Sequence, residues 1–171
     1  MRRVFGITGW KNSGKTTLTE KLVTELVARG WAVSTVKHAH HDFDIDKPGA
    51  DSFRHRQAGA TEVAIVSGRR WALMHELRGE SEPTLDDILA RLAPSDIVLV
   101  EGYKREAHRK IEARRLEAKD RTPLSVNDPN IVAIAADFTV EGETLPVFDL
   151  DDTKSIADFV ERSTGLVAQT K

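Results

Sequence analysis

A glycine-rich segment near the N-terminus carries the strongest chemical signal in the sequence. Residues 9–17 read GWKNSGKTT and follow the apolar run VFGIT. The pattern G-x-x-x-x-G-K-[ST] is satisfied by Gly9, Gly14, Lys15 and Thr16. In this pattern the backbone N–H groups of a tight turn and of a helix start surround a phosphate, the lysine neutralises the β- and γ-phosphates, and the hydroxyl completes a magnesium shell. The segment therefore predicts a nucleotide-binding loop.

A second candidate is the acid that ends the apolar run DIVLVEG at residues 96–102. A phosphate-binding loop needs a carboxylate at the end of a neighbouring buried strand, where it holds magnesium or polarises the metal's water. Glu101 follows four apolar residues and meets this need, whereas Asp96 lies at the opposite end and is expected to be structural. The alternative for Glu101 is an ordinary acid at the end of a strand.

The most unusual stretch follows the predicted second strand and contains three histidines. On an extended chain His38, His40 and Asp42 share one face, and His41 points the other way. Histidine and aspartate at a spacing of two can ligate zinc or nickel. The alternative is a polar loop at the rim of the active site.

Further along this stretch, Asp51 and either Arg54 or His55 are candidates for a segment that senses the γ-phosphate. In such a segment a carboxylate reaches magnesium or water, and an arginine reaches the phosphate. Each of these residues could equally be a solvated helix position.

Strands and helices alternate along the chain and must position these residues. Hydrophobic periodicity predicts strands over residues 2–8, 31–38, 62–67, 69–77, 96–102, 109–116, 130–136 and 145–150, and helices over residues 15–30, 49–60, 84–93 and 153–165. Thr84 is the expected N-cap of the third helix. The pattern predicts one α/β domain over residues 1–171, with a mostly parallel sheet covered by helices on both faces and an antiparallel extension made by a hairpin through Ser67 to Arg70.

Composition limits the classes of protein that fit. The 171 residues are 40% hydrophobic and 30% charged, include no cysteine and carry a formal net charge of −2. A globular domain fits, whereas disulfides, thiolate metal sites and a global positive field for nucleic acid do not. No apolar run reaches the length of a signal-peptide core or a membrane span. We therefore expect a soluble, unprocessed cytoplasmic protein with neither nucleic acid nor membrane as a partner.

Several segments together resemble the MobB family, the molybdopterin-guanine dinucleotide biosynthesis protein B. They are TGWKNSGKTTL, VKHAHHDFDIDKPGADS, AGA, RWALM, LVEGYK and PNIVAIAAD. The resemblance implies a GTPase similar to the SIMIBI class, a weakly hydrolysing homodimer that uses GTP and Mg²⁺ and assists the MobA nucleotidyltransferase in joining GMP to molybdopterin. Molybdopterin or a molybdoenzyme is a further implied partner.

Site residues carry over by position from the same resemblance. Phosphate binding falls on Gly9, Asn12, Ser13, Gly14, Lys15, Thr16 and Thr17. The resemblance also puts Glu101 and Asp51 near the magnesium. From the residue patterns, Thr16 is a further magnesium ligand, and Lys15, Asp51 and Arg54 are the candidate catalytic residues.

The base-reading motif N-K-x-D of many GTPases is absent from the sequence. Asp137, after the predicted strand IVAIAA, is a candidate acceptor for the guanine N1 and N2 hydrogens. The alternative is a strand-end aspartate that caps the next turn.

Two other functional classes fit the same residues. A small-molecule kinase would use the basic segment YKREAHRKIEARR, residues 103–115, as a lid. A nucleotide-dependent metallochaperone would bind metal through His38, His40 and His41.

Association is predicted from the fourth strand, residues 69–77. This strand carries more apolar side chains than a solvent-facing edge strand should expose. They are Trp71, Leu73, Met74 and Leu77. A two-fold homodimer built around this strand would cover one of its faces.

Overall fold

The computed structural model describes residues 2–39 and 43–167, and its contacts divide the chain into two compact units. Unit 1 comprises residues 1–38 and 88–171, and unit 2 comprises residues 39–87. The expectation of a single domain over the whole chain stays a prediction. Within the described ranges, no helix combines the length and the apolar composition that a membrane crossing needs.

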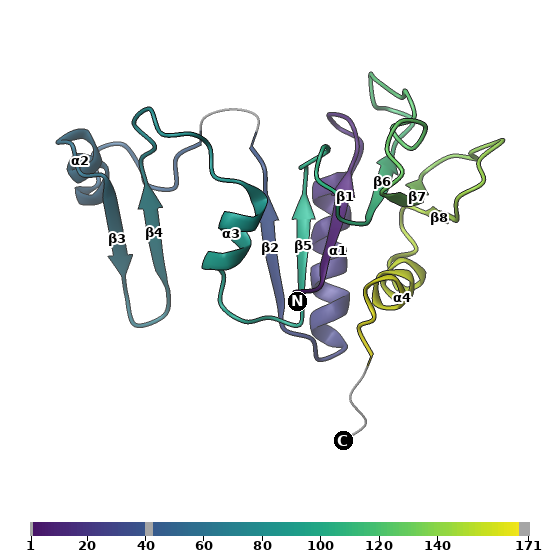
Figure 1. Ribbon diagram of the computed structural model, residues 1–171, viewed down its shortest axis with the longest axis horizontal. Coiled ribbons are helices and arrows are strands. Elements are labelled where there is room, and N and C mark those ends of the chain that lie inside the picture. Colours follow the sequence, from purple (N-terminus) through teal and green to yellow (C-terminus); the bar gives the residue numbers. More distant parts are fainter. Residues whose placement is uncertain (1, 40–42, 168–171) are drawn as a thin grey trace. The chain divides into compact units, whose positions relative to one another are not determined.

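Unit 1 is built on a six-stranded sheet in which all strand pairs are parallel, in the order β2-β5-β1-β6-β7-β8. The strands are β1 (Val4–Thr8), β2 (Val33–Lys37), β5 (Ile97–Glu101), β6 (Lys110–Arg114), β7 (Ile131–Ala136) and β8 (Val147–Asp149). Their carboxyl ends lie along the upper edge of the sheet in Figure 1, as does the loop between β1 and helix α1 (Lys15–Ala28). The mostly parallel α/β fold predicted from the sequence is confirmed.

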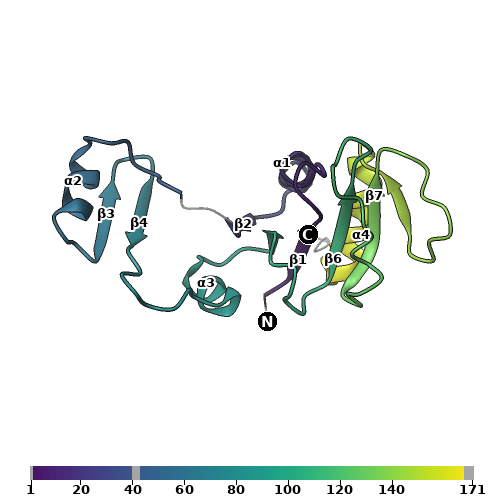
Figure 2. The same ribbon diagram turned by 90° about the horizontal axis from the view of Figure 1, so that it is seen from above.

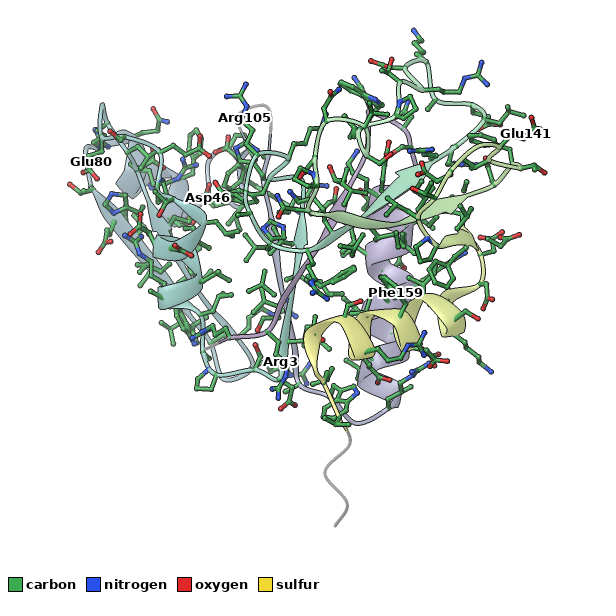
Figure 3. All side chains as sticks on the ribbon, turned by 45° about the vertical axis from the view of Figure 1, so that its right-hand side comes forward. Arg3, Asp46, Glu80, Arg105, Glu141 and Phe159 are labelled. Carbon is green, nitrogen blue, oxygen red and sulfur yellow. The ribbon has the colours of Figure 1, made fainter. Side chains whose placement is uncertain are left out.

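Helices α1 and α4 (Thr153–Thr164) contact each other and pack on one face of this sheet. Residues at helical spacing form the shared core with alternate residues of the central strands: Leu18, Leu22, Leu26, Ile156 and Val160 with Phe5, Ile7, Ile97 and Leu99. Figure 2 shows α1 alongside the strands of the sheet. Phe159 lies between α4 and the sheet (Figure 3), with its ring centroid 6.4 Å from that of Phe5.

On the other face, β6 carries charged side chains that are fully buried. Lys110 Nζ donates hydrogen bonds to Asp128, at 2.9 Å, and to two carbonyl oxygens of the loop at residues 103–109. Glu112 accepts hydrogen bonds from two backbone N–H groups of the loop at residues 115–130. Loops rather than the expected helices cover this part of the sheet, because only loops present free backbone groups to these charges.

The same burial corrects one interpretation of the sequence. The segment at residues 103–115 was a candidate lid for a kinase, yet its second half is strand β6, hydrogen-bonded to β1 and β7. All five residues of β6 are buried. A central strand of the sheet cannot swing open, so residues 110–114 are not part of a lid.

Unit 2 consists of helix α2 (Asp51–Gln57) and a hairpin of β3 (Glu62–Val66) and β4 (Trp71–His75). The predicted hairpin is confirmed, and its turn closes with a 2.9 Å hydrogen bond from Ser67 N to Arg70 O. It forms a two-stranded sheet of its own rather than an extension of the six-stranded sheet, because within the described residues β3 and β4 pair only with each other.

Arg56 of α2 connects this helix through ion pairs to the segment before it and to the end of the hairpin. Its guanidinium forms ion pairs with Asp46 at 2.5 Å, with Asp44 at 2.9 Å and with Glu76 at 2.9 Å. Two acids of the distinctive stretch DFDID are therefore held in structural ion pairs.

Capping side chains mark where helices α3 (Leu85–Arg91) and α4 begin. Helix α3 spans the division between the units, and Thr84 Oγ1 accepts a 3.2 Å hydrogen bond from Asp87 N, which confirms the predicted N-cap. Asp152 caps α4 by accepting a 3.1 Å bond from Ser155 N.

Candidate nucleotide-binding site

The loop between β1 and α1 adopts a backbone that requires glycine. Gly9 has φ +144°, and a Cβ at this position would lie 2.4 Å from Ser13 Oγ and 2.5 Å from the carbonyl oxygen of Ala113. Gly14, immediately before α1, has φ +90°, and Asn12 has φ +63°. These positive φ angles turn the chain tightly, so that the N-terminus of α1 opens onto the loop with its amide groups free.

Lys15 lies along this loop. Its Nζ donates a 2.6 Å hydrogen bond to the carbonyl oxygen of Trp10. Burial lowers the pKa of Lys15; Glu101 raises it, and the neighbouring Lys104 and Lys37 lower it further. The ammonium group therefore sits half-buried with a single backbone acceptor, which a phosphate oxygen can replace.

The two predicted magnesium ligands of unit 1 are in direct contact. Thr16 Oγ1 donates a 2.9 Å hydrogen bond to Glu101 Oε1, and Lys37 Nζ lies 3.3 Å from the same oxygen. Glu101 is buried at the carboxyl end of β5. A hydroxyl and a carboxylate at this position fit Mg²⁺, which prefers oxygen ligands together with phosphate oxygens and water.

Asp51 and Arg54, the predicted switch residues, lie in unit 2. They occupy the first turn and the middle of α2, 4.0 Å apart, and their side chains are 91% and 75% exposed. The structure describes the two units separately, so the roles of Asp51 and Arg54 at the nucleotide stay predictions.

The predicted histidine metal site falls mainly on residues 40–42, which lie outside the described residues. His38 is described, and its ring centroid is 4.9 Å from that of Tyr103. In the described ranges, no three histidine, aspartate or glutamate residues come together as a metal site.

A depression beside the loop contains Asp137. It is lined by residues of the loop and α1, including Gly14, Thr17 and Lys21, and by Arg115 and Asp137 from the ends of β6 and β7. Asp137 Oδ1 accepts a 2.8 Å hydrogen bond from Leu116 N, and Oδ2 lies 3.4 Å from Arg115 Nε. The predicted base-reading residue is thus next to the loop and already anchors the turn after β6.

Sequence reasoning missed three residues around the loop. Trp10 Nε1 donates a 2.7 Å hydrogen bond to the carbonyl oxygen of Thr122, and Lys104 Nζ lies 4.0 Å from the centroid of the Trp10 ring. Lys37 contacts Glu101, as described above. Their positions in the sequence could have identified two of them. Lys37 ends β2 and Lys104 follows β5, and the carboxyl ends of these parallel strands lie at the same edge of the sheet as the loop.

Comparisons with known proteins agree on one family. The family model described as "MobB: Molybdopterin guanine dinucleotide synthesis protein B" matches residues 4–137. The molybdopterin-guanine dinucleotide biosynthesis adapter protein of Escherichia coli (strain K12) is 40% identical over 159 residues, which cover 92% of this chain and 90% of that protein. The adapter protein of Haemophilus influenzae is also 40% identical, over 161 residues that cover 92% of this chain and 87% of that protein.

Solved structures agree as well. The crystal structure of a MobB protein homolog from Bacillus stearothermophilus superposes with a TM-score of 0.73 at 34% identity, covering 96% of this chain and 99% of that one. With a family model that matches most of the chain and relatives that match nearly all of it, the chain belongs to the MobB family, the molybdopterin guanine dinucleotide synthesis protein B family of molybdenum cofactor biosynthesis.

Proposed function

We propose that the chain binds GTP and Mg²⁺ at the loop between β1 and α1 and acts as an adapter in the attachment of GMP to molybdopterin. One observation is the main support for the proposed nucleotide site. The loop, Lys15 and the bonded pair of Thr16 and Glu101 meet at the carboxyl edge of a parallel sheet, directly before a helix N-terminus. The adapter role comes from the relatives that carry that name.

The arrangement of the strands supports one orientation of the nucleotide. Asp137 and Arg115 lie beyond β6 and β7, on one side of the loop, and Glu101 lies on the other side, at the end of β5. We place the guanine beside Asp137, whose carboxylate accepts the N1 and N2 hydrogens, and run the phosphates along the loop toward Glu101. Mg²⁺ at Thr16 and Glu101 would neutralise phosphate charge.

Intrinsic GTP hydrolysis is expected to be slow. No glutamine follows Glu101, and the loop at residues 9–17 contains no arginine, so neither of the usual groups that orient water or stabilise the transition state in cis is supplied there. In this proposal Asp51 and Arg54 of unit 2 are the residues that promote the slow hydrolysis.

A second copy of the chain and a MobA-like nucleotidyltransferase are the proposed partners. The β3–β4 hairpin supports the homodimer, because one of its faces exposes the side chains of Trp71, Leu73 and Val66. Comparing GMP attachment to molybdopterin by the transferase with and without this chain tests the adapter role.

Replacing Lys15 with alanine tests the nucleotide site. The loss of a charge-assisted hydrogen bond to phosphate should cost about 2 to 3 kcal/mol of binding free energy, or roughly 30- to 150-fold in affinity. Calorimetric titration with GTP and magnesium measures it. The melting temperature should stay unchanged, because within the described residues the Lys15 ammonium group bonds only to the Trp10 carbonyl. Equal affinity in the variant would contradict the assignment.

A further inference from the structure

Lys15 and Lys37 lie near the buried carboxylate of Glu101 at the nucleotide site, and a third lysine, Lys104, lies over the Trp10 ring of the same loop. Lys37 forms an ion pair with Glu101, and Lys15 is close enough to Lys37 and Lys104 for both to lower its pKa. Glu101 is a single negative charge, so these groups leave the edge of the sheet with an excess of positive charge, although the whole chain is slightly acidic. Such an excess favours a polyanion.

The lysines differ in how they are held. Lys104 follows two consecutive residues with positive φ, Gly102 at +94° and Tyr103 at +39°, and this turn places its ammonium group over the Trp10 ring. Lys37 is the last residue of β2, and its side chain is 59% exposed and paired with Glu101 at 3.3 Å. The lysine end of this pair faces solvent, so the Lys37 side chain can turn from Glu101 to another anion, while the buried Glu101 carboxylate keeps its hydrogen bond from Thr16.

Lys37 lies on the side of the loop where the terminal phosphate of the nucleotide is expected. The strand order β2-β5-β1-β6-β7 puts Lys37 and the depression at Asp137 on opposite sides of the loop. Lys37 and Glu101 are register partners, with their side chains on the same face as α1. If the base occupies the depression beside Asp137, the terminal phosphate reaches the side of Lys37, and the α-phosphate does not.

We propose that Lys37 is a γ-phosphate-binding residue that exchanges its ion pair with Glu101 for the terminal phosphate of a nucleoside triphosphate. This inference rests on the proposed nucleotide site and adds specificity to it. A triphosphate engages Lys15 and Lys37, whereas a diphosphate engages Lys15 and leaves Lys37 on Glu101. Lys37 thereby distinguishes the two nucleotides.

Replacing Lys37 with methionine tests the proposal through the ratio of two affinities. Methionine keeps the length of the side chain and removes its charge. Titration with GTP and with GDP, each in magnesium and in a chelator, should show GTP affinity falling about 10- to 100-fold, the range of one charge-assisted hydrogen bond. GDP affinity should change less than about threefold, the scale of a screened distant charge. Lys37→Arg should keep most of the preference for GTP.

Arg105→Gln is the matched control. Arg105 is an exposed cation in the loop after β5, and Figure 3 shows its side chain directed away from the fold. The Arg105→Gln substitution should change neither the GTP affinity nor the GDP affinity. Equal losses of GTP and GDP in Lys37→Met, or no loss of GTP, would overturn the role of Lys37 while leaving the site intact. Failure of the wild type to bind either nucleotide would instead refute the proposed function.

Discussion

Gly9 offers the sharpest test of how the loop is built. Alanine at this position would introduce a Cβ 2.4 Å from Ser13 Oγ and 2.5 Å from the carbonyl oxygen of Ala113. Ser13 is itself a buried residue of the loop, and Ala113 belongs to the central strand β6, paired with its neighbours on both sides. The strand cannot yield, so the loop must move.

Two costs add up in Gly9→Ala. A side chain at φ +144° costs about 1 to 3 kcal/mol, because L-residues rarely adopt this region. Forcing an extra methyl group into a packed site costs a further 1 to 3 kcal/mol or so. The variant should therefore lose about 2 to 6 kcal/mol of unfolding free energy. GTP affinity should also fall, because the displaced loop no longer directs its N–H groups at the phosphates.

Gly30→Ala is the control that separates the two costs. Gly30 lies in the same unit with φ +93°, and a Cβ there would meet no atom within 4 Å. Urea unfolding of both variants should show Gly9→Ala to be the less stable by the cost of the clash, and calorimetry should show weakened GTP binding only for Gly9→Ala. If the two variants lose equal stability and bind GTP as the wild type does, close packing is not the reason why position 9 requires glycine.

Two further predictions concern the half-buried His108 and the hairpin. Burial lowers the pKa of His108 to about 4, below its usual 6.5, so the contribution of His108 to stability should be complete above pH 6.5 and be lost as the pH falls from 6.5 to 4. His108→Leu should flatten this decline in urea unfolding measured across that range; an unchanged slope would argue against a neutral buried imidazole. For the hairpin, replacing Trp71 and Leu73 with glutamate should give a monomer in sedimentation at micromolar concentration, since their side chains are 71% and 52% exposed. A monomeric wild type, or a variant that still dimerises, would contradict the proposed interface.

Local patterns predicted most of unit 1 and the start of helix α3. The loop at residues 9–17, the strand that ends in Glu101 and the N-cap at Thr84 each depend on neighbours in sequence, and the structure has all three as expected. Met74 shows the limit of this reasoning. The sequence placed it on a strand with two faces to cover, but Met74 is buried beside its cross-strand partner Val63, whereas Trp71 and Leu73 on the opposite face are exposed.

Contacts between distant segments could not be predicted from local pattern. Lys110 is a charged residue in a short polar segment, for which sequence favours a surface position, yet it is fully buried. Its burial depends on Asp128 and on two carbonyl groups of the loop at residues 103–109, and no periodicity reveals these partners. Likewise, Lys37 gains its position from β5, a strand some 60 residues away in sequence.

The buried charges of β6 connect this hidden part of the fold to the nucleotide site. Lys110 bonds to the carbonyl oxygen of Lys104, so it fixes the loop that places the Lys104 ammonium over Trp10. Glu112 bonds to backbone N–H groups of the loop at residues 115–130, which also supplies the Thr122 carbonyl to the indole of Trp10. Burying charges costs free energy that hydrophobic residues would not cost. Here Lys110 and Glu112 each bond to backbone groups of a loop that borders the phosphate-binding turn, so β6 sets the positions of both loops in advance of the ligand.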